Sequence, residues 1–136
     1  MIKQTAVSGI LLMAVSTGAA SACSIPDGWT VMQNAREQPG QIALKLPSVP
    51  VGVGQRFSID ILVCAGGQAA AGEIRLDATM PAHKHGMNYR PEVKPVEGNT
   101  YRGSGMFFHM PGKWQISVDL VTGSESRRFV LEVPAR

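Results

Sequence analysis

Cysteine, histidine and long apolar runs are all scarce in this chain. Its 136 residues include two cysteines, Cys23 and Cys64, and no C-x-x-C motif. This excludes a paired-thiol exchange site and a c-type haem attachment site. Only three histidines are present, and no pair of carboxylates flanks them, so general acid–base catalysis lacks its usual second group. We therefore do not expect an enzyme.

Charge is sparse and scattered. Thirteen basic and ten acidic residues give a net charge of +3, and only Arg127 and Arg128 are adjacent basic residues. No basic patch indicates nucleic-acid binding. Beyond the first 22 residues, no stretch approaches the roughly 20 apolar residues that a membrane span needs. We expect neither a nucleic-acid partner nor a transmembrane span in the mature chain.

Residues 1–22 have the features of a cleaved signal peptide. An apolar run over 6–14 follows a short positive start, and Ala20-Ser21-Ala22 is a small-residue cleavage motif. The mature chain would then begin at Cys23 in the periplasm. Two alternatives follow for that cysteine: a disulfide with Cys64, or a lipid anchor. Lipoprotein signals usually carry leucine three residues before the cysteine, where this chain has Ala20, so soluble export is favoured.

Short segments with alternating apolar residues predict an all-β fold. Residues 23–40 read as an N-terminal arm and 41–136 as one β-sandwich domain, because no stretch of ten residues has a helical period. About seven strands with turns between them indicate an antiparallel, immunoglobulin-like sandwich. The expected strands are 41–46, 56–64, 73–80, 89–96, 100–109, 113–121 and 127–133. The expected core includes Ile59, Ile61, Leu76, Trp114, Ile116, Val118 and Phe129.

One stretch, from Met80 to Met110, contains all three histidines and four of the seven methionines. The candidate metal ligands in it are His83, His85, Met87, His109 and Met110. If successive strands alternate in direction, the loops that carry them emerge at one end of the sandwich. Residues 83, 85 and 87 are spaced i, i+2, i+4 and face one way in an extended chain. Thioether sulfur suits Cu(I) and imidazole serves several transition metals, so the expected ion is copper.

Each of these residues also has a structural interpretation. Met80 continues the apolar face of strand 73–80 and is expected to pack in the core. Met106 alternates with Phe107 in strand 100–109 and is expected to pack at the surface or against the second sheet rather than bind metal. In that strand, alternate residues from Tyr101 to His109 should share one face. His109 could equally form a hydrogen bond near a turn. Met87 and Met110 remain open between metal binding and packing.

The sequence from 80 to 89, Met-Pro-Ala-His-Lys-His-Gly-Met-Asn-Tyr, together with the segment from Tyr101 to Trp114, resembles the YtkA-like domain, which is related to FixH-type proteins. The resemblance covers about residues 57–133. It implies an exported or membrane-anchored β-sandwich linked to copper supply or to the assembly of copper-containing respiratory oxidases. FixH-type proteins carry a membrane anchor, whereas this chain shows only a cleavable leader.

Two functional hypotheses follow. In the first, the protein is an exported copper-binding protein that carries or buffers Cu(I) for copper homeostasis or oxidase assembly. Its partners would be the metal ion and a periplasmic cuproprotein or respiratory oxidase component. In the second, the same loops bind no metal and dock a periplasmic redox or cytochrome partner. Titration with Cu(I), Cu(II) and Zn(II) separates the two.

Overall fold

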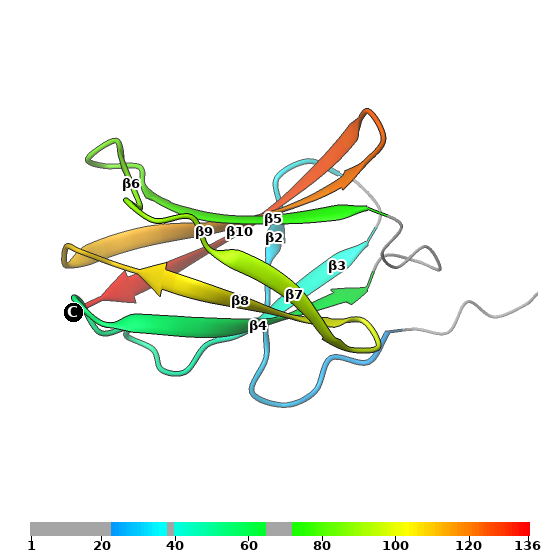
Figure 1. Ribbon diagram of the computed structural model, residues 1–136, viewed down its shortest axis with the longest axis horizontal. Helices are drawn as coiled ribbons and strands as arrows, with labels where there is room; N and C mark the ends of the chain where they lie inside the picture. Colours follow the sequence, from blue (N-terminus) through cyan, green and yellow to red (C-terminus); the bar gives the residue numbers. More distant parts are fainter. Residues whose placement is uncertain (1–22, 38–39, 65–71) are drawn as a thin grey trace, which may run out of the picture.

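The computed structural model describes residues 23–37, 40–64 and 72–136. Two antiparallel five-stranded sheets pack face to face as a sandwich (Figure 1), and the described residues contain no helix. None of their segments is therefore a helix long and apolar enough to cross a membrane. The expected signal peptide, 1–22, lies outside the described residues.

The order of the strands confirms the immunoglobulin-like prediction. One sheet has the order β1-β3-β4-β8-β7 and the other β2-β10-β9-β5-β6. Leaving out the two-residue strands, these are the ABED and CFG sheets of a constant-type immunoglobulin sandwich. The bounds are β1 (Thr30–Val31), β2 (Gln33–Asn34), β3 (Gln41–Lys45), β4 (Arg56–Cys64), β5 (Glu73–Met80), β6 (His85–Gly86), β7 (Glu92–Glu97), β8 (Thr100–Phe107), β9 (Gly112–Thr122) and β10 (Glu125–Ala135).

The core lies between the sheets, where the alternation in the sequence placed it. Along β9 every second residue from Trp114 to Leu120 is buried, and β5 buries Leu76, Ala78 and Met80 in the same way. All seven residues of the predicted core are buried, and the most exposed of them, Leu76, is only 7% exposed. Because successive side chains of a strand point to opposite faces, the alternate apolar residues of each strand identified the face that is buried.

The prediction for the end of β8 was wrong. Pairing with β4 shifts by one residue between Phe57 and Ile59, and Gly105 opposite this shift has φ +83°. A glycine in this left-handed conformation marks a β-bulge, which changes which residues face inward. As a result Met106 is fully buried, whereas Phe107 is only partly buried. The face expected to run from Tyr101 to His109 is therefore broken at Gly105.

An N-terminal arm closes one side edge of the sandwich. β1 pairs with β3 in one sheet, and β2 pairs with β10 in the other, so the arm crosses between the layers. Met32, between the two short strands, is 4% exposed and donates its backbone N–H to Ile42. These strands were not predicted, because two residues are too few to show a periodic pattern.

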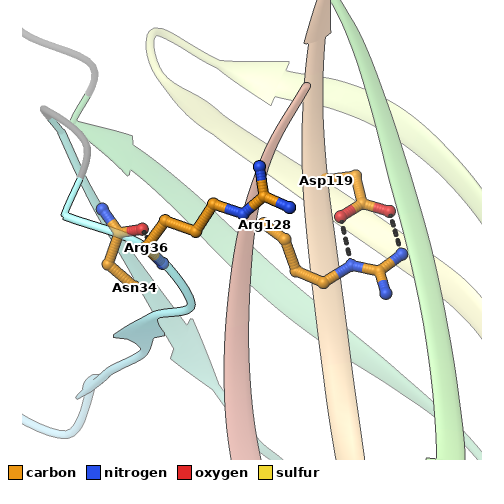
Figure 2. A network of polar contacts seen from close by, with 4 residues as sticks. All are labelled: Asn34, Arg36, Asp119 and Arg128. Atoms are coloured by element: carbon orange, nitrogen blue, oxygen red, sulfur yellow. Dashed lines mark hydrogen bonds and ion pairs between the residues drawn. The ribbon is translucent and has the colours of Figure 1, made fainter. Parts of the chain in front are cut away.

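Charged side chains cover the outer face of the second sheet. Arg128 on β10 donates two hydrogen bonds to the carboxylate of Asp119 on β9, at 2.7 and 2.8 Å. Figure 2 shows this pair beside the end of the arm, where the Arg36 backbone N–H donates to the Asn34 side chain at 3.2 Å. Arg128 is well exposed, so this pair contributes modestly to stability.

Cys23 and Cys64 form a disulfide, as predicted. Cys64 ends β4, at the end of the sandwich opposite the β5–β6 hairpin and the β8–β9 turn (Figure 1). The bond joins the beginning of the arm to a core strand. A disulfide of this kind is typical of proteins that fold in an oxidising compartment.

Candidate metal site

Three connections meet at one end of the sandwich, as the alternation of strand direction predicted. They are the β3–β4 loop, the β5–β6 hairpin with the segment after it, and the β8–β9 turn (Figure 1). Gly54 in the first donates its backbone N–H to the carbonyl of Phe108 in the third, at 2.8 Å. This bond fixes the chain immediately before His109.

A tight turn presents the first two histidines. His83 donates its backbone N–H to Met80 at 3.2 Å, and Lys84 donates to Pro81 at 3.4 Å. Lys84 has φ +52°, the left-handed conformation that reverses the chain. His85 then pairs directly with Met80. Residues 83 to 87 are therefore not one extended segment, and the predicted i, i+2, i+4 alignment was wrong for His83.

His85 is the central member of a row of three imidazoles. Opposite residues of an antiparallel pair point to the same face of the sheet, so His85 faces the same way as the buried Met80. The ring centre of His85 is 6.3 Å from that of His83 and 6.2 Å from that of His109. Two histidines on one ion, with metal–nitrogen bonds of about 2.0 Å, have ring centres up to roughly 6 Å apart. Both separations slightly exceed this limit, so the rings would have to move closer to bind one ion together.

His109 lies against the aromatic core. Its ring and that of Trp114 form a T-shaped contact, with ring centres 5.4 Å apart. Phe108 stacks on the Trp114 ring, with centres 4.5 Å apart and 6° between the ring planes. The Trp114 indole N–H donates to the carbonyl of Met110 at 3.0 Å. A fully buried side chain thus supports both His109 and Met110.

One ring nitrogen of His109 has an unusual environment. Nδ1 is buried and has no hydrogen-bond partner in the part of the chain that the structure describes. Leaving a buried polar atom unpaired costs roughly 1–3 kcal/mol, so such an atom calls for an explanation. An unprotonated imidazole nitrogen can bind a metal ion, and the ring that carries this atom lies 6.2 Å from that of His85, centre to centre.

The methionines divide into two groups. Met80 is buried in the core, as predicted, whereas Met106, expected at the surface or against the second sheet, is fully buried in the core as well. Met87 and Met110 are partly buried and pack against the core from its end. Met87 is held by its backbone N–H, which donates to Ala78 at 3.2 Å, and it lies two residues after His85. Their use as ligands stays a prediction.

Carboxylates and thiolates do not complete this site. Across residues 23–37, 40–64 and 72–136, no three His, Cys, Asp or Glu side chains gather closely enough to hold a metal ion. Zinc sites are usually built from these groups. The partly buried thioethers of Met87 and Met110 belong to the same connections as the histidines, so a metal site here would combine imidazole with thioether.

An aromatic contact at the rim was not evident from the sequence. The guanidinium carbon of Arg56 lies 4.5 Å above the ring of Tyr89, and this ring meets Phe107 at 5.5 Å. The contacts fasten the segment after β6 to the β4 and β8 ends of the opposite sheet. The bulge at Gly105 turns Phe107 towards Tyr89, and no pattern in the sequence predicted this bulge.

The fold and its end loops define a class: an immunoglobulin-like β-sandwich that carries histidine and methionine at one end. Within this class, the family model described as YtkA-like matches residues 34–119, more than half of the chain. The protein belongs to the YtkA-like family, as the resemblance indicated. Comparisons with curated proteins and with solved structures gave no match.

Proposed function

We propose that this protein is an exported copper-binding protein that carries or buffers Cu(I) in the periplasm. The observation that carries the proposal is the row of three imidazoles, in which the buried Nδ1 of His109 has no partner among the described residues, with Met87 and Met110 in the same connections. Imidazole and thioether are neutral ligands, and thioether favours Cu(I) over harder ions. No pair of carboxylates flanks these histidines in the sequence, so general acid–base catalysis lacks its usual second group and we propose no catalysis.

Export is supported by the leader-like sequence and by the disulfide. The sulfur of Cys23 is already bonded to Cys64, and one sulfur cannot also form the thioether of a lipid anchor. This favours a free periplasmic protein. Delivery of copper to a cuproprotein or to a respiratory oxidase component is the role that family membership suggests.

Metal titration of the apo-protein tests the proposal. We expect one equivalent of Cu(I) to bind in competition with a chromogenic chelator, and Zn(II) to bind more weakly. Replacing His83 and His85 together by Ala should abolish Cu(II) binding and leave the circular-dichroism spectrum unchanged, because both residues are exposed. If this double variant binds copper like the wild type, the metal hypothesis fails and docking of a redox partner replaces it.

A matched pair of methionine variants tests the thioether. Met87→Leu removes the sulfur but keeps the apolar volume, a change that usually costs less than about 1.5 kcal/mol of stability. Met106→Leu is the control, because Met106 is fully buried away from solvent. Cu(I) affinity should fall at least about tenfold, or ~1.4 kcal/mol, in Met87→Leu only. Equal affinities in both variants would remove Met87 from the ligand set.

A further inference from the structure

The two side edges of the sandwich differ. The β1–β2 arm closes one edge, but at the other edge β6 covers only the last residues of β5. A groove of about 680 Å³ runs along this uncovered part. Residues 73–77 of β5 form one wall, and residues 89–93, which lead into β7, form the other.

The uncovered part of β5 has backbone groups ready to pair. The carbonyl of Ala78 accepts a hydrogen bond from the backbone N–H of Met87, on the side of β5 where β6 lies. Because antiparallel strands alternate in the direction of their hydrogen bonds, the N–H and C=O of Leu76 and Ile74 point to the same side. Within the described parts of the chain, neither residue has a backbone partner there. Ala78 ends the free stretch, since its own N–H is bonded to the Asp77 side chain at 2.8 Å.

The side chains of this stretch alternate in character. Ile74 and Leu76 face the interior, whereas Glu73, Arg75 and Asp77 are exposed on the outer face. Arg75 donates two hydrogen bonds of 3.0 Å to Glu73, and these bonds lower the pKa of Glu73 from its ordinary value. The exposed charges therefore read acidic, basic, acidic along the edge.

We infer that this edge receives an extended segment of another protein, which adds a strand beside residues 73–77. Main-chain hydrogen bonds to Ile74 and Leu76 would supply affinity, as in other cases of strand addition. Cross-strand charge pairing would supply selectivity. The complementary segment carries basic, apolar, acidic, apolar and basic residues in that order, and this pattern is the same in either direction of the strand.

A second copy of this chain fits the edge poorly. Pairing the whole free stretch with itself sets Glu73 opposite Asp77 of the second copy and Arg75 opposite its own equivalent. Like charges then meet at every exposed position, which destabilises a strand pair. Sliding the pair towards Ala78 is blocked, because β6 and Met87 already use the backbone there. The charge pattern thus favours a different protein as the partner.

Synthetic peptides and NMR test the inference in metal-free buffer, so its outcome does not depend on copper binding. The probe is a capped peptide, Gly-Lys-Val-Glu-Val-Lys-Gly, and its control is the charge-inverted Gly-Glu-Val-Lys-Val-Glu-Gly. We expect the probe to shift the amide signals of Ile74 and Leu76 and to slow their hydrogen exchange. Reversing three cross-strand charge pairs should weaken binding roughly tenfold.

Two variants sharpen the test. Arg75→Glu should exchange the preference at the central position, so that a peptide with lysine there binds better than the probe. Ile74→Pro removes an edge N–H that does not belong to the β5–β9 ladder, and it should abolish binding. The far-UV circular dichroism of each variant checks its fold, and the charge exchange decides the matter if Ile74→Pro does not fold.

Three results would overturn the inference. The first is no shift of these amides at millimolar probe. The second is equal binding of both peptides, or a preference that Arg75→Glu leaves unchanged. The third is a concentration-dependent dimer that protects residues 73–77 without any peptide, since the second copy would then be the occupant.

Discussion

Trp114 connects the core to the candidate metal site, and its replacement gives a graded prediction. The side chain is fully buried, stacks on Phe108 at 4.5 Å and donates a hydrogen bond of 3.0 Å to Met110. Trp114→Ala should cost about 3–5 kcal/mol, a large part of the 5–15 kcal/mol by which domains are typically stable. Trp114→Phe keeps most of the volume but loses the indole hydrogen bond, so we expect about 2 kcal/mol.

Urea denaturation followed by circular dichroism measures both changes. With a slope of about 1–3 kcal/mol per molar urea, the midpoint of Trp114→Phe should fall by about 1 M and that of Trp114→Ala by more. Trp29→Phe is the matched control, because Trp29 lies outside the core cluster. If Trp114→Phe and Trp29→Phe unfold at the same midpoint, the proposed support of the β8–β9 turn by Trp114 is wrong.

Three further predictions concern the backbone and the disulfide. Gly105→Ala should destabilise the fold by about 1–2 kcal/mol, because an L-residue is strained at φ +83°. Its control is Gly86→Ala, which should change the urea midpoint little because an added methyl group there meets nothing within 4 Å. Replacing both Cys23 and Cys64 by Ser should cost about 2–4 kcal/mol, since the bond closes a loop with a sequence separation of 41. An unchanged melting temperature would contradict this. Lys84→Gly should keep copper affinity and Lys84→Val should reduce it, because β-branched residues rarely adopt the left-handed conformation found here. Equal affinities of the two variants in isothermal titration would refute this.

The sequence predicted the core well because burial follows a simple period. Trp114, Ile116 and Val118 alternate without interruption, and nothing in β9 disturbs the pattern. β8 carries the same kind of signal, but Gly105 adds one residue and exchanges the faces. A glycine in a strand can mark a bulge or simply a small residue, so the sequence alone did not locate the change.

The site was predicted in part for a similar reason. Alternating strand direction places His85 and His109 at the same end, and this requires no knowledge of side-chain geometry. The turn at Lys84 was not predictable, because lysine is not a typical residue for a left-handed position. The buried Nδ1 of His109 depends on how its ring meets Trp114, which only three-dimensional packing determines.

The disulfide and the histidines lie at opposite ends of the sandwich, which are called its two poles here. β4 connects them, and its nine residues at about 3.3 Å each span about 30 Å. A tag, fluorophore or sensor surface attached near Cys23 would therefore stand well clear of His85 and His109. Immobilisation through that pole orients every molecule alike, with its histidine end towards the solution. The domain could therefore be attached to a surface in one defined orientation without blocking its histidine end.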